Sequence, residues 1–239
     1  MTEHLIEKYL ISISKSEVAE TTKRFFKTGK GDYSQHDIFL GIKVPEIRKA
    51  VKKFESTPLS EIERLLKSKY HEIRLFALLY MVTNFSKSNK YEQENIYKTY
   101  LKNIEYVNNW DLVDSSAHYI VGAYLHNKNK ELIYKLARSS YMWKRRIAIV
   151  STYYFIKQGE FDDTFEIAKI LLDDEEDLIH KAVGWMLREV GKKDESKEKA
   201  FLNTHYQKMP RVMLRYAIER FSKEERKAYL QGLILKHEA

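Results

Sequence analysis

Four stretches of the chain resemble one another, and their spacing constrains the fold more than any other feature. Each places a charged or basic side chain just before a short core of small and apolar residues. The spacing of roughly 34 to 40 residues is the period of two-helix solenoid repeats, which bury their apolar faces by stacking on their neighbours. The register is inexact, so the repeats are degenerate. The stretches begin at Glu72, Arg145, His180 and Leu214.

Composition supports a chain made almost entirely of helices. Only 8 Gly and 3 Pro interrupt it, and 32% of its residues are charged. We predict an all-α fold in which paired helices stack into a curved α-solenoid, with one helix of each pair lining a concave wall. A single domain is expected over residues 1–239. The expected helices span 3–14, 16–28, 71–85, 91–106, 131–138, 143–157, 161–172, 178–190, 197–206, 210–221 and 224–236, with further helix starts at Val44-Pro45, at Pro58-Leu59 and at Trp110, the last continuing through Val121.

Several classes of protein are disfavoured by what the sequence lacks. It has no Cys, which excludes disulfides and thiolate metal sites and suits a cytoplasmic location. No apolar run reaches the length of a membrane span. Gly-rich phosphate loops and the common hydrolase and zinc motifs are absent, and the His residues lack ligand spacing. We therefore expect neither a metal nor a cofactor.

Charge is layered along the chain. The formal net charge of 42 − 34 = +8 fits a polyanionic partner such as nucleic acid. Residues 139–159 contain bases and no acid, residues 160–177 are strongly acidic, and residues 178–193 are basic again. Second helices that are basic and first helices that are acidic predict a basic concave groove and an acidic convex back.

The segment Asn108-Asn109-Trp110-Asp111-Leu112-Val113-Asp114 is the strongest candidate for chemistry. Trp110 and Asp114 are four residues apart and share one helical face, where an aromatic ring and a carboxylate together can receive a cation. A structural interpretation competes with this one, because Asn108 or Asn109 can cap the helix and Asp111 lies in its first turn, where the helix dipole favours an acid. Trp185 also lies among bases, whereas for Trp143 we favour simple packing.

Four segments are similar to the AlkD family of DNA alkylation repair enzymes. The match as a whole spans about residues 20 to 222, with the segments in the family's order and at similar separations. Three resemble the signature segments of that family and one resembles its N-terminal segment. In chain order, the segments are 39–48, Trp110-Asp111-Leu112-Val113-Asp114, Trp143-Lys144-Arg145-Arg146-Ile147-Ala148 and 181–189.

The resemblance implies an α-solenoid of HEAT-like repeats that excises N3- and N7-alkylated purines from DNA. Such enzymes are monofunctional glycosylases without a metal or organic cofactor. By position, Asp114 matches the catalytic carboxylate, and Trp110 and Trp185 match the tryptophans that cradle the deoxyribose of the lesion. Two departures stand out: Asn109 replaces a second Trp, and Asp177-Leu178 replaces aromatics found in some relatives.

The expected partner is double-stranded DNA that contains alkylated bases, bound by a monomer. Arg146 matches a residue that contacts the DNA backbone in the resembled family. The remaining expected contacts are bases of the predicted groove and of the N-terminal segment. The full predicted DNA-binding set is Lys43, Arg48, Lys144, Arg145, Arg146, Lys181, Arg188, Arg211 and Arg215.

The predicted chemistry needs one carboxylate and no strong acid. An alkylated purine is cationic and leaves readily, so the difficulty is the positive charge that develops on the sugar, which a carboxylate and ring faces stabilise. Two alternatives remain: a non-enzymatic binder of damaged or branched DNA, and a protein-binding solenoid. The carboxylate beside the two tryptophans argues against the former, and the basic second helices against the latter.

Overall fold

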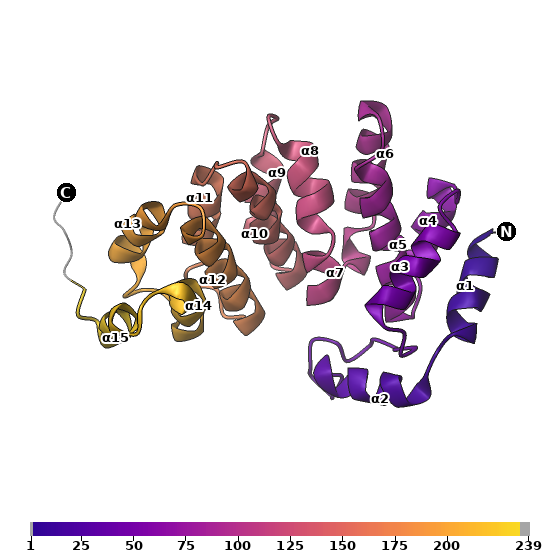
Figure 1. Cartoon of the computed structure of the whole chain (residues 1–239), viewed down its shortest axis with the longest axis horizontal. Coiled ribbons are helices and arrows are strands. Elements are labelled where there is room, and N and C mark those ends of the chain that lie inside the picture. The colour runs from indigo at the N-terminus through magenta and orange to yellow at the C-terminus, as the bar shows by residue number, and fades with distance from the viewer. Residues whose placement is uncertain (1, 235–239) are drawn as a thin grey trace. The chain divides into compact units, whose positions relative to one another are not determined.

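The protein is built of helices (Figure 1). The structure, a computed structural model, describes residues 2–234, and within that range no β-strand forms beyond an isolated bridge between Ile38 and Tyr70. No helix in the described range is long and apolar enough to cross a membrane. The predicted all-α, solenoid-type fold is confirmed. The curvature and the basic groove stay predictions.

The chain divides into two compact units, Met1–Ser116 and Ala117–Ala239, which we call the N-terminal and C-terminal units. Each unit is described by itself below. The single domain expected over residues 1–239 stays a prediction.

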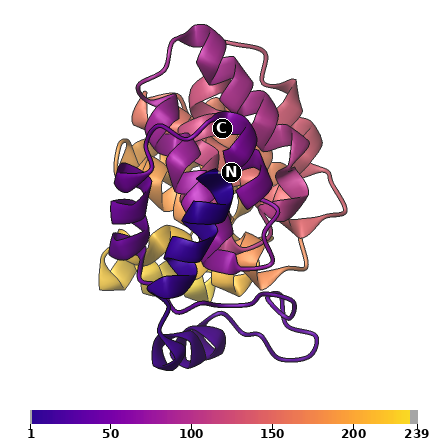
Figure 2. The ribbon, with the colours of Figure 1, turned by 90° about the vertical axis from the view of Figure 1, so that its right-hand side faces the viewer.

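In the N-terminal unit, helices stack in pairs. α1 packs on α4, and α5 packs on both α3 and α4. α2 lies below α1 and is turned across it, as Figures 1 and 2 both show. The helices of this unit are α1 (Thr2–Ser12), α2 (Ser16–Phe25), α3 (Val44–Lys53), α4 (Leu59–Leu65), α5 (His71–Phe85), α6 (Lys90–Lys102), the 3₁₀ helix η1 (Ile104–Tyr106) and α7 (Trp110–Asp114).

The predicted start of α3 and the full span of α5 are confirmed. Pro45 stands in the first turn of α3, where its missing N–H leaves no helical hydrogen bond unmade. Nearly all of α5 is buried, which explains why its sequence is apolar on every face. α5 is therefore the central helix of the unit.

A loop between α2 and α3 fixes the position of α2. Gly41 has φ +75°, and a Cβ atom there would lie 2.2 Å from the Lys15 carbonyl oxygen and 2.5 Å from the Ala19 nitrogen. Only glycine permits this approach of α2 to the loop. The Glu72 carboxylate, 3% exposed, accepts hydrogen bonds from the backbone N–H groups of Leu40 (2.9 Å), Gly41 (2.7 Å) and Ile42 (3.3 Å), and so anchors the loop to α5.

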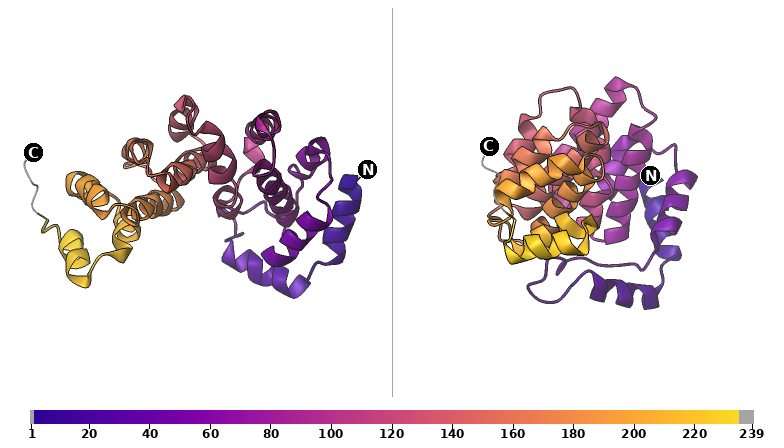
Figure 3. Two further views of the ribbon diagram at one scale, coloured as in Figure 1. Left: turned by 45° about the horizontal axis from the view of Figure 1, so that its top comes forward. Right: turned by 60° about the vertical axis from the view of Figure 1, so that its left-hand side comes forward.

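In the C-terminal unit the second helix of each pair stacks on the next. α10 packs on η2 and α12, and α12 packs on α14 (Figures 1 and 3). The helices are the π-helix η2 (His118–Gly122), α8 (Ala123–Leu125), α9 (Glu131–Ala137), α10 (Met142–Lys157), α11 (Asp162–Ile170), α12 (Asp177–Gly191), α13 (Glu195–His205), α14 (Arg211–Ala217), the 3₁₀ helix η3 (Ile218–Arg220) and α15 (Lys223–Gln231).

Small residues allow this stacking. A Cβ atom on Gly184 of α12 would lie 2.4 Å from the Met213 carbonyl oxygen, and one on Gly122 of η2 would lie 2.2 Å from the Ser151 carbonyl oxygen. The small residues recognised in the repeated stretches therefore mark the places where second helices approach most closely.

The helices predicted over 16–28, 91–106 and 210–221 end early, at Phe25, Lys102 and Ala217, and short 3₁₀ helices follow the last two. Two further predicted helices were wrong in extent. The α-helix expected from Trp110 through Val121 ends at Asp114, is followed by turn residues 115 and 116, and resumes as a π-helix. Ser115 and Ser116 bond back to the Leu112 carbonyl, a local bond that competes with helix continuation. The helix expected over 224–236 ends at Gln231, because Gly232 adopts φ +74° as its C-cap, and the expected residues 235 and 236 lie outside the described residues.

Candidate functional site

The structural tasks at the start of α7 are carried out by Asn109 and Asp111. The Asn109 side chain caps the helix by accepting a hydrogen bond from the Trp110 N–H at 2.7 Å. Its amide nitrogen donates to Ser34 Oγ (2.6 Å) and Asp37 Oδ2 (2.7 Å). Asn109 is completely buried, so the residue that departs from the resembled family ties α7 to the loop before α3.

A buried charge network supports the same end of α7. His71 Nε2 lies 2.8 Å from Asp111 Oδ2, and His71 Nδ1 lies 3.3 Å from Asp37 Oδ2. Asp37 also pairs with the Arg74 guanidinium. Charged groups at this depth require such mutual pairing.

The pKa values of this network are shifted in opposite directions. Burial alone lowers the pKa of His71, but the Asp111 and Asp37 carboxylates outweigh it and raise that pKa to about 9. Burial alone raises the pKa of Asp37, but the hydrogen bond from His71 and the charge of Arg74 lower it to about 2. Near neutral pH the network holds a charged imidazolium between carboxylates.

Trp110 is held by aromatic residues of α2 and of the loop that follows it. Its ring stacks on Phe26 at a centroid distance of 5.1 Å and an interplanar angle of 16°, and it meets Phe25 edge-on at 5.7 Å. Its indole N–H donates to the Tyr33 hydroxyl at 3.2 Å. The indole is half-buried. These contacts fix the orientation of the Trp110 ring, for which the sequence predicts a functional role.

Asp114 is the last residue of α7 and is half-buried. A carboxylate at the C-terminal end of a helix opposes the macrodipole, so helix stability does not explain an acid at this position. Tyr100 of α6 is completely buried nearby and bonds to Ser116 Oγ at 3.2 Å. Burial raises the pKa of Tyr100, and the Asp114 charge raises it further. Tyr100 therefore stays a neutral phenol next to the carboxylate.

Trp185 lies in α12 of the C-terminal unit. Its indole N–H donates to Glu189 Oε1 at 3.1 Å, and its ring lies 5.8 Å from that of Tyr153 on α10. Glu189 is only 7% exposed and also accepts from Lys192 Nζ at 2.5 Å. Like Trp110, Trp185 is half-buried and oriented by a bond to its indole nitrogen. The predicted packing role of Trp143 is confirmed, because its side chain is 4% exposed within α10.

Lys157, one turn after Tyr153, completes this aromatic cluster. Its ammonium lies 4.3 Å from the Tyr153 ring centroid and 5.3 Å from that of Tyr119. Burial lowers the pKa of Lys157, and the charge of Glu189 partly offsets that effect. An ammonium placed over two aromatic rings shows that this cluster accommodates positive charge.

Three of the predicted DNA-binding arginines take part in helix packing. Arg145 pairs with Asp174 through Nε–Oδ2 (2.5 Å) and Nη2–Oδ1 (3.1 Å). Arg146 is 5% exposed and donates to the Leu178 carbonyl. Arg188 pairs with Glu219. Arg146 is buried because its guanidinium reaches across to the next second helix, and its contact with DNA stays a prediction.

The other predicted bases are more accessible. Lys43 and Arg48 are exposed on or beside α3, Arg211 and Arg215 are exposed on α14, and Lys144 is half-buried on α10. Lys181 pairs with Asp177 at 2.6 Å, so the acid that departs from the family pattern neutralises a predicted phosphate contact. Trp110 and Asp114 share α7 in the N-terminal unit, whereas Trp185 and the bases of α10, α12 and α14 belong to the C-terminal unit.

Sequence reasoning missed the residues that hold the tryptophans. Glu189 follows Trp185 by four residues, and this helical spacing could have identified it. Tyr33 carries no such signal, because it lies 77 residues from its partner Trp110. The sequence distinguishes Tyr33 only as an aromatic residue in a Gly-rich loop.

Comparisons with known proteins agree with this architecture. A family model described as DNA alkylation repair enzyme matches residues 6–221. A solved structure, described as a predicted DNA alkylation repair enzyme from Enterococcus faecalis, superposes with a TM-score of 0.68 at 17% sequence identity, covering 88% of this chain and 97% of that one. At this identity the similarity shows the fold. No curated protein matches the chain.

Proposed function

The chain belongs to the DNA alkylation repair enzyme family, and from that premise we propose that it is a glycosylase that excises cationic N3- and N7-alkylated purines from double-stranded DNA. Asp114 is the proposed catalytic carboxylate, and Trp110 and Trp185 are the proposed sugar-facing rings. Neither a metal nor an organic cofactor takes part in the proposed reaction.

One observation carries the proposal: residues other than Asp114 perform the structural roles that could explain the Trp110 segment. Asn109 caps α7 and Asp111 pairs with the buried His71. Asp114 stands at the end of the helix where an acid is disfavoured. A carboxylate that serves neither as cap nor as first-turn acid, on the same short helix as an oriented tryptophan, fits a role in chemistry.

The proposed mechanism relies on electrostatic stabilisation. As the glycosidic bond of a cationic purine breaks, positive charge moves onto the deoxyribose and the neutral base departs. An ionised Asp114 and the faces of the two indoles lower the energy of this oxocarbenium-like state. Water, oriented in this proposal by Asp114, then adds to the sugar carbon and gives up a proton to that carboxylate or to solvent, which leaves the sugar neutral. The leaving group is already cationic, so a second acid is unnecessary, in contrast to the pair used in O-glycoside hydrolysis.

The test is release of free base from DNA that contains 7-methylguanine. We expect the wild-type protein to release it and Asp114→Asn to be slower by about a hundredfold or more, the effect of losing about 3 kcal/mol of transition-state stabilisation. Affinity for the DNA should be retained or slightly raised, because the substitution removes an anion near phosphates.

Asp111→Asn is the matched control, since it changes a carboxylate on the same helix. It should lower the melting temperature through the His71 pair and leave the excision rate of the folded protein close to that of the wild type. Undiminished excision by folded Asp114→Asn would refute the catalytic assignment. Binding of alkylated DNA without any release by the wild type would instead favour a non-enzymatic binder.

A further inference from the structure

A cavity of about 460 Å³ lies between α3 and α5, within the N-terminal unit. Its floor is apolar, formed by the buried side chains of Val51 and Leu79. Its volume is within the range of small-molecule sites, which combine an apolar body with a few converging polar groups. Of the residues that line it, the sequence analysis singled out only Arg48, as a predicted contact with DNA.

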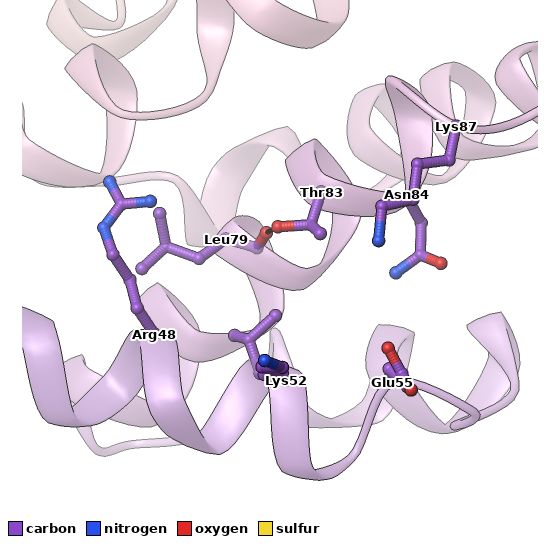
Figure 4. A pocket seen from close by; sticks show the side chains of 8 residues that line it. Arg48, Lys52, Glu55, Leu79, Thr83, Asn84 and Lys87 are labelled. Carbon is purple, nitrogen blue, oxygen red and sulfur yellow. Dashed lines mark hydrogen bonds between the residues drawn. The ribbon is translucent and has the colours of Figure 1, made fainter.

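Three cations surround the cavity against one carboxylate. Arg48 and Lys52 are one turn apart on α3, and Lys87 follows α5. Figure 4 shows Arg48 and Lys87 at opposite ends of the cavity, with Lys52 between them and Glu55 below Asn84. Within residues 2–234, none of the three cations forms an ion pair with a carboxylate, in contrast to Arg145 and Arg188. The net charge of the lining is +2, from three bases and one acid.

Polar groups of α5 complete the lining. The Asn84 amide nitrogen donates to the Tyr80 carbonyl at 3.0 Å, which leaves its carbonyl oxygen as an acceptor. The Thr83 hydroxyl donates to the Leu79 carbonyl at 2.8 Å and can still accept a hydrogen bond. With Glu55, these oxygens could accept hydrogen bonds from hydroxyl or amino groups. The cavity therefore offers cations for an anion and acceptors for a polar, uncharged body.

Stabilisation of the C-terminal end of α3 does not by itself explain why bases line the cavity. Lys52 and Lys53 both lie in the last turn of α3, where cations complement the macrodipole, yet only Lys52 lines the cavity. Arg48 lies in the middle of α3, away from that end. Its planar guanidinium suits two-point recognition of phosphate oxygens, and an adjacent ammonium adds charge.

We propose that the cavity between α3 and α5 binds a phosphate ester, with the phosphate against Arg48 and Lys52 and the hydroxyl-bearing part toward Glu55 and Asn84. The proposed ester is a free mononucleotide. A phosphate of the DNA backbone shares this chemistry, but contact with DNA is already predicted at Arg48, so the DNA backbone is the alternative that the test separates from the proposal. The proposal concerns binding alone, so its failure leaves the proposed excision reaction untouched.

The test titrates the full chain with two probes. Isothermal titration with deoxyadenosine 5′-monophosphate tests the free ester, and fluorescence anisotropy with an undamaged duplex over a range of salt tests the DNA backbone. Arg48→Gln and Lys52→Gln are compared with Lys49→Gln, which removes an exposed base from the same helix but not from the cavity.

One result supports the proposal. Binding of the mononucleotide that weakens about tenfold or more in both cavity variants, and not in Lys49→Gln, identifies a small-molecule site. Failure to bind the mononucleotide overturns the proposal, even if each cavity variant lowers the DNA salt slope by about 0.9, because a lower slope alone shows only a contact with DNA phosphate of the kind already predicted at Arg48. If the cavity variants and Lys49→Gln behave alike with both probes, the charge of α3 acts without a specific site and the proposal is overturned.

Discussion

Glu189 acts through Trp185 and is therefore a candidate positioning residue. Its carboxylate fixes the indole N–H and adds negative potential beside the ring. Glu189→Gln keeps an acceptor and loses the charge, whereas Glu189→Leu loses both. We expect the Leu variant to excise 7-methylguanine several-fold to thirtyfold more slowly with little change in KM, and the Gln variant to be intermediate, in line with cation–π terms of roughly 0.5 to 2 kcal/mol.

Single-turnover kinetics with the protein in excess over the DNA measure this effect, and thermal unfolding serves as its control. Equal losses of stability in both variants, with excision unchanged per folded molecule, would show that Glu189 only supports packing. That outcome would leave Asp114 as the candidate carboxylate.

His71 predicts a pH-dependent stability. Its pKa is raised from the ordinary 6.5 to about 9, so its contribution is fully present below 6.5 and is lost as the pH rises through about 9. His71→Gln should lower the free energy of unfolding by about 3 kcal/mol at pH 6, because it leaves buried carboxylates without their cation. Denaturant unfolding should be measured at pH 6 and pH 10. The difference in free energy of unfolding between the wild type and His71→Gln should be smaller at pH 10. A constant difference would mean that the imidazole is not charged in the folded state.

At the scale of the helices, Gly184 tests how closely α12 approaches α14. In an open helix, Gly→Ala stabilises by up to about 1 kcal/mol. Here a Cβ atom would meet the Met213 carbonyl oxygen at 2.4 Å and Tyr216 Cβ at 2.5 Å, so Gly184→Ala should instead lower the melting temperature. Thermal unfolding followed by circular dichroism measures the change. An unchanged or higher melting temperature would contradict the close approach of the second helices.

The first and last residues of a helix could be predicted where residues at those positions in the sequence determine them. Pro45 marks the start of α3, and an apolar run marks α5. The break after Asp114 was missed because Ser115 and Ser116 compete with the helix only through side-chain bonds that propensity does not weigh.

Long-range contacts of the candidate site were beyond the reach of the sequence. A basic residue on a helix suggests exposure, yet Arg146 is buried because a carbonyl of the next second helix accepts its guanidinium. The partners of Asn109 lie in a loop 72 and 75 residues earlier in the chain. Tertiary pairing of this kind has no local pattern from which it could be predicted.

At the scale of the whole molecule, the net charge of +8 predicts salt-dependent binding to DNA. Lys144 and Arg215 are bases of the second helices without a described ion pair within residues 2–234. Their joint reversal, Lys144→Glu with Arg215→Glu, should weaken duplex binding and lower the salt slope by about 0.9 for each lost contact. Fluorescence anisotropy at several salt concentrations measures the slope.

Lys135→Glu with Lys197→Glu is the control for this charge reversal, because it changes the net charge by the same amount and both bases are exposed on first helices, α9 and α13. If both proteins lose affinity equally with the same slope, overall charge rather than the predicted basic groove governs binding.

The contacts of α7 with the loop that holds Tyr33 and Ser34 also imply an order of folding. Paired helices such as α9 with α10 are neighbours in the chain and close short loops, which is a fast process. The hydrogen bonds that Trp110 and Asn109 donate to Tyr33 and Ser34 close loops of 77 and 75 residues, and loop closure of that length carries a larger entropic penalty. During synthesis, α2 leaves the ribosome long before the helix against which it packs. The proposed recognition surface is thus completed last within its unit, because Tyr33 and Ser34 find their partners only once α7 has been synthesised.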